Sequence, residues 1–188
     1  ETLLIKILNR AKYLAAQGEK LFATTHFLRF LREDFFLCDF QEDPTLLRSF
    51  ARIDDFDVFS SIKAWTEHPD PILSCLSNYL VDRRLFRIYF SDKPFDHNHL
   101  EIAKNRVEKI LNLKKGEGDW FIGTGEVCVM AYDQETGPIL VKTAQGNIEE
   151  LISAISSPNN LIPLQPEVKY FLCLPKTVKL NPDSEEEE

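Results

Sequence analysis

The spacing of the apolar residues changes near residue 85, and this change constrains the fold more than any other feature of the chain. Before it, apolar residues recur every three or four positions, which is the period of amphipathic helices. After it, short apolar runs bounded by turn residues alternate with stretches of helical period, which is typical of a sheet with covering helices. The pattern predicts an α+β protein with a helical region, residues 1–84, and a sheet domain, residues 85–176.

Two Asp-Pro pairs mark helix starts in the first region. An Asp carboxylate accepts hydrogen bonds from the free N–H groups at a helix N-terminus, and Pro suits the first helical position because it has no N–H to satisfy. Asp43-Pro44 and Asp70-Pro71 therefore predict the starts of two helices. Gly18 is expected to end the first helix of the chain, because glycine readily adopts the left-handed conformation found after helix ends.

The second region has the order strand, helix, strand, strand, helix, strand. This is the ferredoxin-like order, in which two helices cover one face of an antiparallel sheet. Asn147 and Glu150 resemble a capping box, which predicts the start of the second helix. The other face is expected to lie under the helical region or a partner subunit, because the strand near residue 127 is apolar on both sides. Strands are expected at residues 85–90, 126–132, 138–143 and 168–174, and helices at residues 98–112 and 148–156.

The net charge of the 188-residue chain is −8, and the terminal run Glu185–Glu188 supplies four of those negative charges. An acidic protein of this kind lacks the broad basic surface that non-specific nucleic-acid binding requires. The polar composition after Pro175 predicts a disordered acidic tail, residues 177–188.

The four cysteines are far apart and form no C-x-x-C pair, which argues against a zinc knuckle and a disulfide framework. Buried free thiols in a cytoplasmic protein are expected. No apolar run approaches the roughly 18 residues that a membrane span needs, and no signal peptide is visible. The opening Glu1-Thr2, without Met and already in helical pattern, indicates a piece of a longer protein. The cysteines are Cys38, Cys75, Cys128 and Cys173.

Candidate metal ligands are sparse. A catalytic metal site needs several convergent His and carboxylate side chains. The four histidines are instead predicted near helix ends, and the dipeptide His-Asp does not occur. We therefore expect neither a catalytic residue nor a metal site in this chain. The histidines are His26, His68, His97 and His99.

Two further patterns have a structural and a functional interpretation. One is the acidic cluster of Asp54, Asp55 and Asp57, which can cap a helix or bind a hard cation. An EF-hand loop needs more ligands than this cluster has and a glycine at its turn, so helix capping is the simpler interpretation. Glycines between Gly116 and Gly125 precede a predicted strand, so no helix N-terminus is available there to hold a phosphate. We interpret this glycine-rich segment as a connection.

The segment Asp82-Arg83-Arg84-Leu85-Phe86-Arg87 places three arginines within five residues at a predicted helix-to-strand junction. Guanidinium groups bind phosphate through two parallel hydrogen bonds and keep their charge when partly buried. If Arg83 and Arg87 point the same way, they can bind a nucleotide triphosphate, and Arg84 then points elsewhere. The alternative is ion pairing with Asp82, Glu67 or a neighbouring subunit, and spacing alone leaves both open.

The stretch IDDFDVFSSIKAWTEHPDPILSCLSNYLVDRRLFRIYF resembles the region downstream of the catalytic core in HD-superfamily phosphohydrolases of the dGTP and dNTP triphosphohydrolase type. In that family an acidic pair opens a helix, and the next helix ends in an Arg-x-Leu-aromatic-basic motif. The opening ETLLIKILNRAKYLA is similar to the long helix that follows the family's metal site. The resemblance covers roughly residues 1–95.

The resemblance implies that the intact parent is a cytoplasmic, oligomeric phosphohydrolase that uses a divalent metal on deoxynucleoside triphosphates. The family's metal is held by a His, a His-Asp pair and a later Asp, all upstream of this region, so none of them is carried over. Arg83 and Arg87 correspond to the Arg and the basic residue that contact a regulatory nucleotide at a subunit interface. Arg stands at position 87 where the family has Lys.

The resemblance thus implies an accessory role in assembly or regulation for this chain, whose partner is the rest of the parent. Two other interpretations remain. One is a non-catalytic module that binds a small molecule or a protein through the sheet domain, and the other is a structural dimerisation region.

Overall fold

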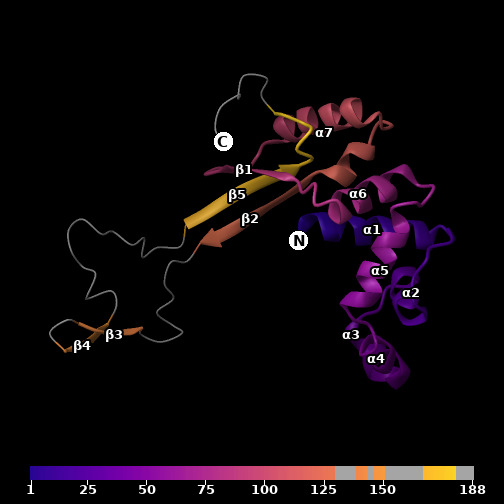
Figure 1. Cartoon of the computed structure of the whole chain (residues 1–188), viewed down its shortest axis with the longest axis horizontal. Coiled ribbons are helices and arrows are strands. Elements are labelled where there is room, and N and C mark those ends of the chain that lie inside the picture. Colours follow the sequence, from indigo (N-terminus) through magenta and orange to yellow (C-terminus); the bar gives the residue numbers. More distant parts are fainter. Residues whose placement is uncertain (130–138, 144–145, 151–166, 181–188) are drawn as a thin grey trace. The chain divides into compact units, whose positions relative to one another are not determined.

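The computed structural model describes residues 1–129, 139–143, 146–150 and 167–180 (Figure 1). Within residues 1–129, six helices precede the first strand, which confirms the predicted α+β class with helices first. The elements in chain order are α1 (Thr2–Ala16), α2 (Thr25–Arg32), α3 (Leu37–Glu42), α4 (Pro44–Phe50), α5 (Asp55–Trp65), α6 (Pro71–Val81), β1 (Arg87–Ser91), α7 (His97–Leu111), the 3₁₀ helix η1 (Glu117–Phe121), β2 (Gly123–Val129), β3 (Leu140–Lys142), β4 (Ile148–Glu150) and β5 (Glu167–Leu174).

Contacts between residues group the chain into two compact units. Unit 1 contains Glu1–Tyr89, Asp96–Thr124 and the described residues from Leu172 onward, and unit 2 contains Phe90–Phe95 together with the described part of Gly125–Phe171. Helix α7 therefore groups with the helices of the first region, although the sequence assigned it to the sheet domain. The division of the chain between residues 84 and 85 stays a prediction.

The core of unit 1 forms where α1 packs against α2 and α6, and α5 packs against α6. Helix α1 presents one apolar face, on which Ile7 is fully buried. Trp65 at the end of α5 is also buried, and its indole Nε1–H donates to the carbonyl oxygen of Phe22 at 2.9 Å. This bond satisfies the polar group of a large buried ring.

Both predicted Asp-Pro helix starts are confirmed. Asp43 accepts a hydrogen bond from the Thr45 N–H at 2.8 Å, and Asp70 accepts one from the Leu73 N–H at 2.7 Å. Pro follows each cap as the first residue of α4 or α6. The sequence located these two starts correctly because a cap depends on residues within one helical turn.

The acidic cluster also caps a helix. Asp54 accepts hydrogen bonds from the N–H groups of Phe56 and Asp57, and the Asp57 carboxylate accepts one from the Asp54 N–H at 2.9 Å. This reciprocal capping box uses the carboxylates that a cation would need. Gly18 has φ +82 just beyond α1, as expected for a helix-ending glycine.

Strands β1, β5 and β2 form an antiparallel sheet in that order, and β3 pairs with β4 in a separate two-stranded sheet (Figure 1). The strands expected near residues 85, 126 and 168 are therefore present, as β1, β2 and β5, and the expected helix near 98 is α7. Residues 130–132 of the second expected strand lie outside the described residues. The ferredoxin-like arrangement is compatible with these elements and stays a prediction.

The helix expected from residue 148 is wrong at its start. Ile148 pairs with Lys142 and Glu150 pairs with Leu140 in an antiparallel hairpin. The Thr143 N–H donates to the Asn147 carbonyl at 2.8 Å, so Asn147 closes the hairpin and does not cap a helix. Cross-strand pairing here outweighs the local capping signal. Residues 151–156 of the expected helix lie outside the described residues.

The disordered tail expected at residues 177–188 stays a prediction, and the structure describes its first four residues. Val178 is fully buried, and Arg106 of α7 donates to the carbonyl oxygens of Lys179, at 2.8 Å, and Leu180. A buried valine and a guanidinium that binds backbone carbonyls give this segment a fixed position on unit 1. The rest of the predicted tail, residues 181–188, lies outside the described residues.

Candidate functional site

The junction between α6 and β1 carries the arginines that the sequence singled out. Helix α6 ends at Val81, and Arg83 has φ +57, in the left-handed region. Its N–H still donates to the Leu80 carbonyl at 3.1 Å. This conformation is uncommon for a residue with a Cβ. Because the helix stops here, helical spacing does not place Arg83 and Arg87 on one face.

Arg84 is held by its neighbours. Its Nη2 donates to Asp82 Oδ2 at 2.6 Å, and its guanidinium carbon Cζ lies 5.4 Å from the centre of the Tyr79 ring. The side chains of this ion pair are about half exposed, so the pair contributes little to stability. The ion-paired alternative with Asp82 is therefore correct for Arg84.

Arg83 and Arg87 differ from Arg84. Both are exposed, and within the described ranges neither guanidinium makes a hydrogen bond or an ion pair. Exposed guanidinium groups without an acidic partner keep their hydrogen-bonding capacity for a ligand. The hypothesis that these two residues bind phosphate stays a prediction. Their guanidinium groups are available for such a ligand.

Tyr79 lies beneath this junction. Its ring is 7% exposed and makes edge-on contacts with Phe86, at 6.2 Å between centroids, and with Phe121, at 6.4 Å. Burial raises the pKa of the Tyr79 hydroxyl, and the neighbouring Cys75 raises it further. The hydroxyl therefore stays protonated and able to donate a hydrogen bond at neutral pH.

A further arginine, Arg10 of α1, is largely buried, and the sequence analysis missed its role. It makes two hydrogen bonds to the Asp70 carboxylate, at 3.0 and 2.6 Å, and both side chains are only 11–12% exposed. The Arg10 guanidinium also lies 5.0 Å from the Tyr13 ring centre and 4.9 Å from that of Trp120. Because 60 positions separate the two partners, no local signal in the sequence predicts this pair.

A cavity of about 340 Å³ lies beside the Arg10–Asp70 pair in unit 1, and Cys75, Lys114 and Glu117 also line it. Both acids of this cavity are occupied, because Glu117 accepts from the Lys114 N–H at 2.8 Å and Asp70 is paired with Arg10. Each carboxylate among the described residues of this cavity therefore already has a hydrogen-bond partner.

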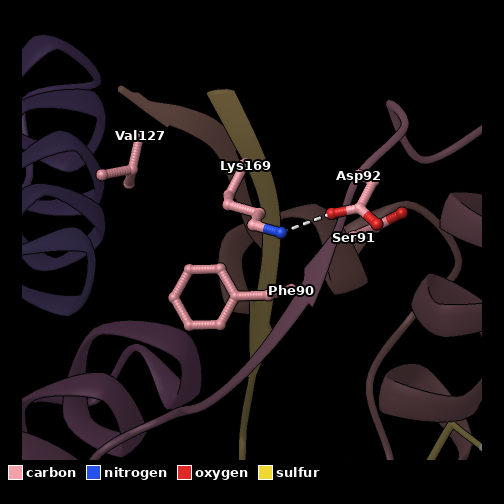
Figure 2. A pocket seen from close by; sticks show the side chains of 5 residues that line it. All are labelled: Phe90, Ser91, Asp92, Val127 and Lys169. Atoms are coloured by element: carbon pink, nitrogen blue, oxygen red, sulfur yellow. Dashed lines mark hydrogen bonds and ion pairs between the residues drawn. The ribbon is translucent and has the colours of Figure 1, made fainter. Parts of the chain in front are cut away.

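Unit 2 contains a more open hollow of about 460 Å³, which Figure 2 shows from close by. Phe90 and Val127 form its apolar walls, with exposures of 63% and 41%. Lys169 crosses it to pair with Asp92 at 2.6 Å. Large apolar side chains exposed beside an ion pair are typical of a binding surface.

The histidines lie where the sequence placed them, near helix ends. His68 Nδ1 accepts from the Asp70 N–H at 3.1 Å just before α6, and His99 lies in the first turn of α7 with Asp96. In the part of the chain that the structure describes, no group of three or more His, Cys, Asp or Glu side chains is arranged to hold a metal.

The cysteines are free, as expected, but only Cys173 is fully buried. Cys75 is half-buried, and Cys38 and Cys128 are exposed, so the expectation of four buried thiols is wrong. Cys38 lies on α3, a short helix without buried residues. Burial raises the pKa of both the Cys75 and the Cys173 thiol, which lowers their reactivity.

Among solved structures, the chain is similar to a phosphohydrolase of Bacteroides thetaiotaomicron VPI-5482, with 30% sequence identity and a TM-score of 0.77. The match covers 92% of this chain and 43% of the phosphohydrolase, so the chain spans less than half of that protein. No family model matches the chain, and no curated protein matches it. The chain therefore has a phosphohydrolase-like fold. Among its described helices, none is long and apolar enough to cross a membrane.

Proposed function

We propose that this chain is the accessory C-terminal part of an HD-type, metal-dependent phosphohydrolase that acts on deoxynucleoside triphosphates. The observation that carries the proposal is the match of 92% of the chain to less than half of a phosphohydrolase. The parent protein is then a cytoplasmic oligomer in which this chain contributes assembly or regulation.

The described residues do not fit the divalent metal that such a parent uses. Several of their carboxylates cap helices or form ion pairs, as Asp54 and Asp70 do. The histidines lie near helix ends, and none converges with enough acids to hold an ion. The proposal therefore assigns the metal and the hydrolytic step to the rest of the parent, and no step of the reaction to this chain.

Phosphate-release assays test this division of labour. We expect the pure chain to release neither phosphate nor triphosphate from dGTP with any divalent metal, whereas the parent protein releases triphosphate. Release by the chain above a no-protein control would place catalysis within these residues. A parent without activity on any deoxynucleoside triphosphate would contradict the substrate class.

Within this role, Arg83 and Arg87 are proposed to bind the phosphates of a regulatory nucleotide. They are the arginines of the junction that are free of acidic partners among the described residues, whereas Arg84 is paired with Asp82. A charge-assisted hydrogen bond contributes roughly 1.5–3 kcal/mol, so loss of one arginine is expected to weaken binding about ten- to a hundredfold.

Calorimetric titration of dGTP into the metal-free parent protein, in which hydrolysis is not expected, tests the two residues. Arg83→Ala and Arg87→Ala are expected to weaken binding most, and Arg84→Ala is the matched control that is expected to weaken it least, because Arg84 contacts Asp82 and the Tyr79 ring and not the ligand. Equal affinities in the wild type and all three variants would show that the arginines form only a solvated basic turn.

The hollow of unit 2 favours a second candidate function, a module that binds a small apolar molecule. Phe90 and Val127 are exposed on its walls, and it is large enough for such a ligand. Fluorescence titration with an apolar dye tests it, because Val127→Glu should then abolish dye binding. Equal dye binding by Val127→Glu and the wild type would rule this candidate out.

A further inference from the structure

One aromatic ring contacts a sequence neighbour of each candidate arginine. The Tyr79 ring lies 5.4 Å from the Arg84 guanidinium and 6.2 Å from the Phe86 ring. Arg84 follows Arg83 in the chain, and Phe86 precedes Arg87. The ring therefore packs against two residues that lie between Arg83 and Arg87 in the chain, and it restrains the backbone of this segment.

Tyr79 is itself fixed from several directions. Its ring packs edge-on against Phe86 at 78° and against Phe121 of η1 at 83°. Only 7% of the residue is exposed, so the packed ring has little freedom to move.

We propose that Tyr79 is a positioning residue that fixes the spacing between Arg83 and Arg87 for the phosphates of a nucleotide. This inference rests on the proposed phosphate-binding role of the two arginines. Ligand binding by a long side chain costs conformational entropy, and a backbone that is already ordered lowers this cost. Tyr79 supplies that order without contacting the ligand, because its ring is buried.

The left-handed backbone of Arg83 makes this support necessary. An L-residue at φ +57 is less stable than in the right-handed region, so the conformation persists only where the surrounding structure holds it. The restraints on the next residue are the Asp82–Arg84 ion pair and the contact of Arg84 with the Tyr79 ring. Loss of the ring removes the second restraint together with the contact to Phe86.

The test is calorimetric titration of inorganic tripolyphosphate into the parent protein and its variants. Tyr79→Phe keeps the ring and is expected to bind within about twofold of the wild type, whereas Tyr79→Leu removes the ring and should weaken binding roughly tenfold. Phe27→Leu is the matched control, because Phe27 has the same 7% exposure and packs on Trp65, away from the junction. Circular dichroism verifies that each variant is folded.

A double-variant cycle separates positioning from general destabilisation. In an Arg83→Ala background, Tyr79→Leu should cause little further loss of affinity, because one of the two groups that it positions is already absent. Wild-type affinity in Tyr79→Leu, an equal loss in Phe27→Leu, or fully additive losses would overturn the inference. If Arg83→Ala binds tripolyphosphate like the wild type, the proposed phosphate site itself fails.

Discussion

The two ends of helix α6 each carry an arginine site, and the two sites are built in opposite ways. At the N-terminus, buried Arg10 makes two hydrogen bonds to Asp70 between two aromatic rings. At the C-terminus, Arg83 and Arg87 are exposed and have no acidic partner among the described residues. The first arrangement stabilises a fold, and the second leaves charge available for a ligand.

The difference arises from what surrounds each guanidinium. Desolvation makes a buried charge costly unless it is paired, so Arg10 requires Asp70. Arg83 and Arg87 remain in water, where an unpaired guanidinium costs nothing. The number of arginines in a cluster therefore says little about their role. Whether each guanidinium has an acidic partner distinguishes a structural arginine from one that is available for a ligand.

The largest expected effect is on the buried pair. Asp70→Ala leaves the Arg10 charge buried without its partner and removes the N-cap of α6, and it should lower the free energy of unfolding by about 3 kcal/mol or more. Urea denaturation measures this loss. Asp43→Ala is the matched control, because Asp43 is also an N-cap before Pro but pairs with Arg29 at the surface, so its loss should be clearly smaller. Equal losses would contradict the contrast.

The pH dependence of stability follows from the same pair. Burial opposes the charge of Asp70, but hydrogen bonds from Arg10 and from the Leu73 N–H outweigh it, so its pKa lies below the ordinary value. The carboxylate therefore stabilises the fold above the unfolded pKa of about 4, and this contribution is lost as the pH falls through the lower folded pKa. Denaturation from pH 6 to pH 2 should show a smaller acid-induced loss in Asp70→Asn than in the wild type. Parallel curves would exclude Asp70 as a source of acid sensitivity.

A smaller effect is expected at the exposed site. Arg83→Gly replaces an L-residue at φ +57 with the residue that adopts this conformation most easily, so it should raise the free energy of unfolding by up to about 1 kcal/mol. Arg83→Ala keeps the Cβ and should leave it nearly unchanged. Destabilisation by Arg83→Gly in urea would show that the arginine side chain stabilises the fold.

Local features of the sequence predicted local features of the fold. The caps at Asp43, Asp54 and Asp70 each depend on residues within one turn, and all three are present. The helix predicted from the capping box at Asn147 was wrong, because Ile148 pairs with Lys142 in a hairpin. The residues of the box carry no information about this pairing.

Contacts between distant residues account for what the sequence did not predict at the candidate site. The Arg10–Asp70 pair joins α1 to α6, and the edge-on contact of Tyr79 with Phe121 joins α6 to η1. Neither pair shares a local pattern. By contrast, Arg84 and Asp82 are only two positions apart in the chain, and their ion pair was one of the alternatives that the sequence left open.

A ligand-induced shift in the melting temperature of the parent protein tests the central claim most directly, because it reports stability and binding together. At a dGTP concentration of about 100 times Kd, binding stabilises the folded state by roughly 2.7 kcal/mol. The account predicts that dGTP raises the melting temperature of the wild type and of Arg84→Ala, but much less that of Arg83→Ala, whose melting temperature without ligand equals that of the wild type. An unchanged dGTP shift in Arg83→Ala, or a lower melting temperature of this variant without ligand, would contradict it.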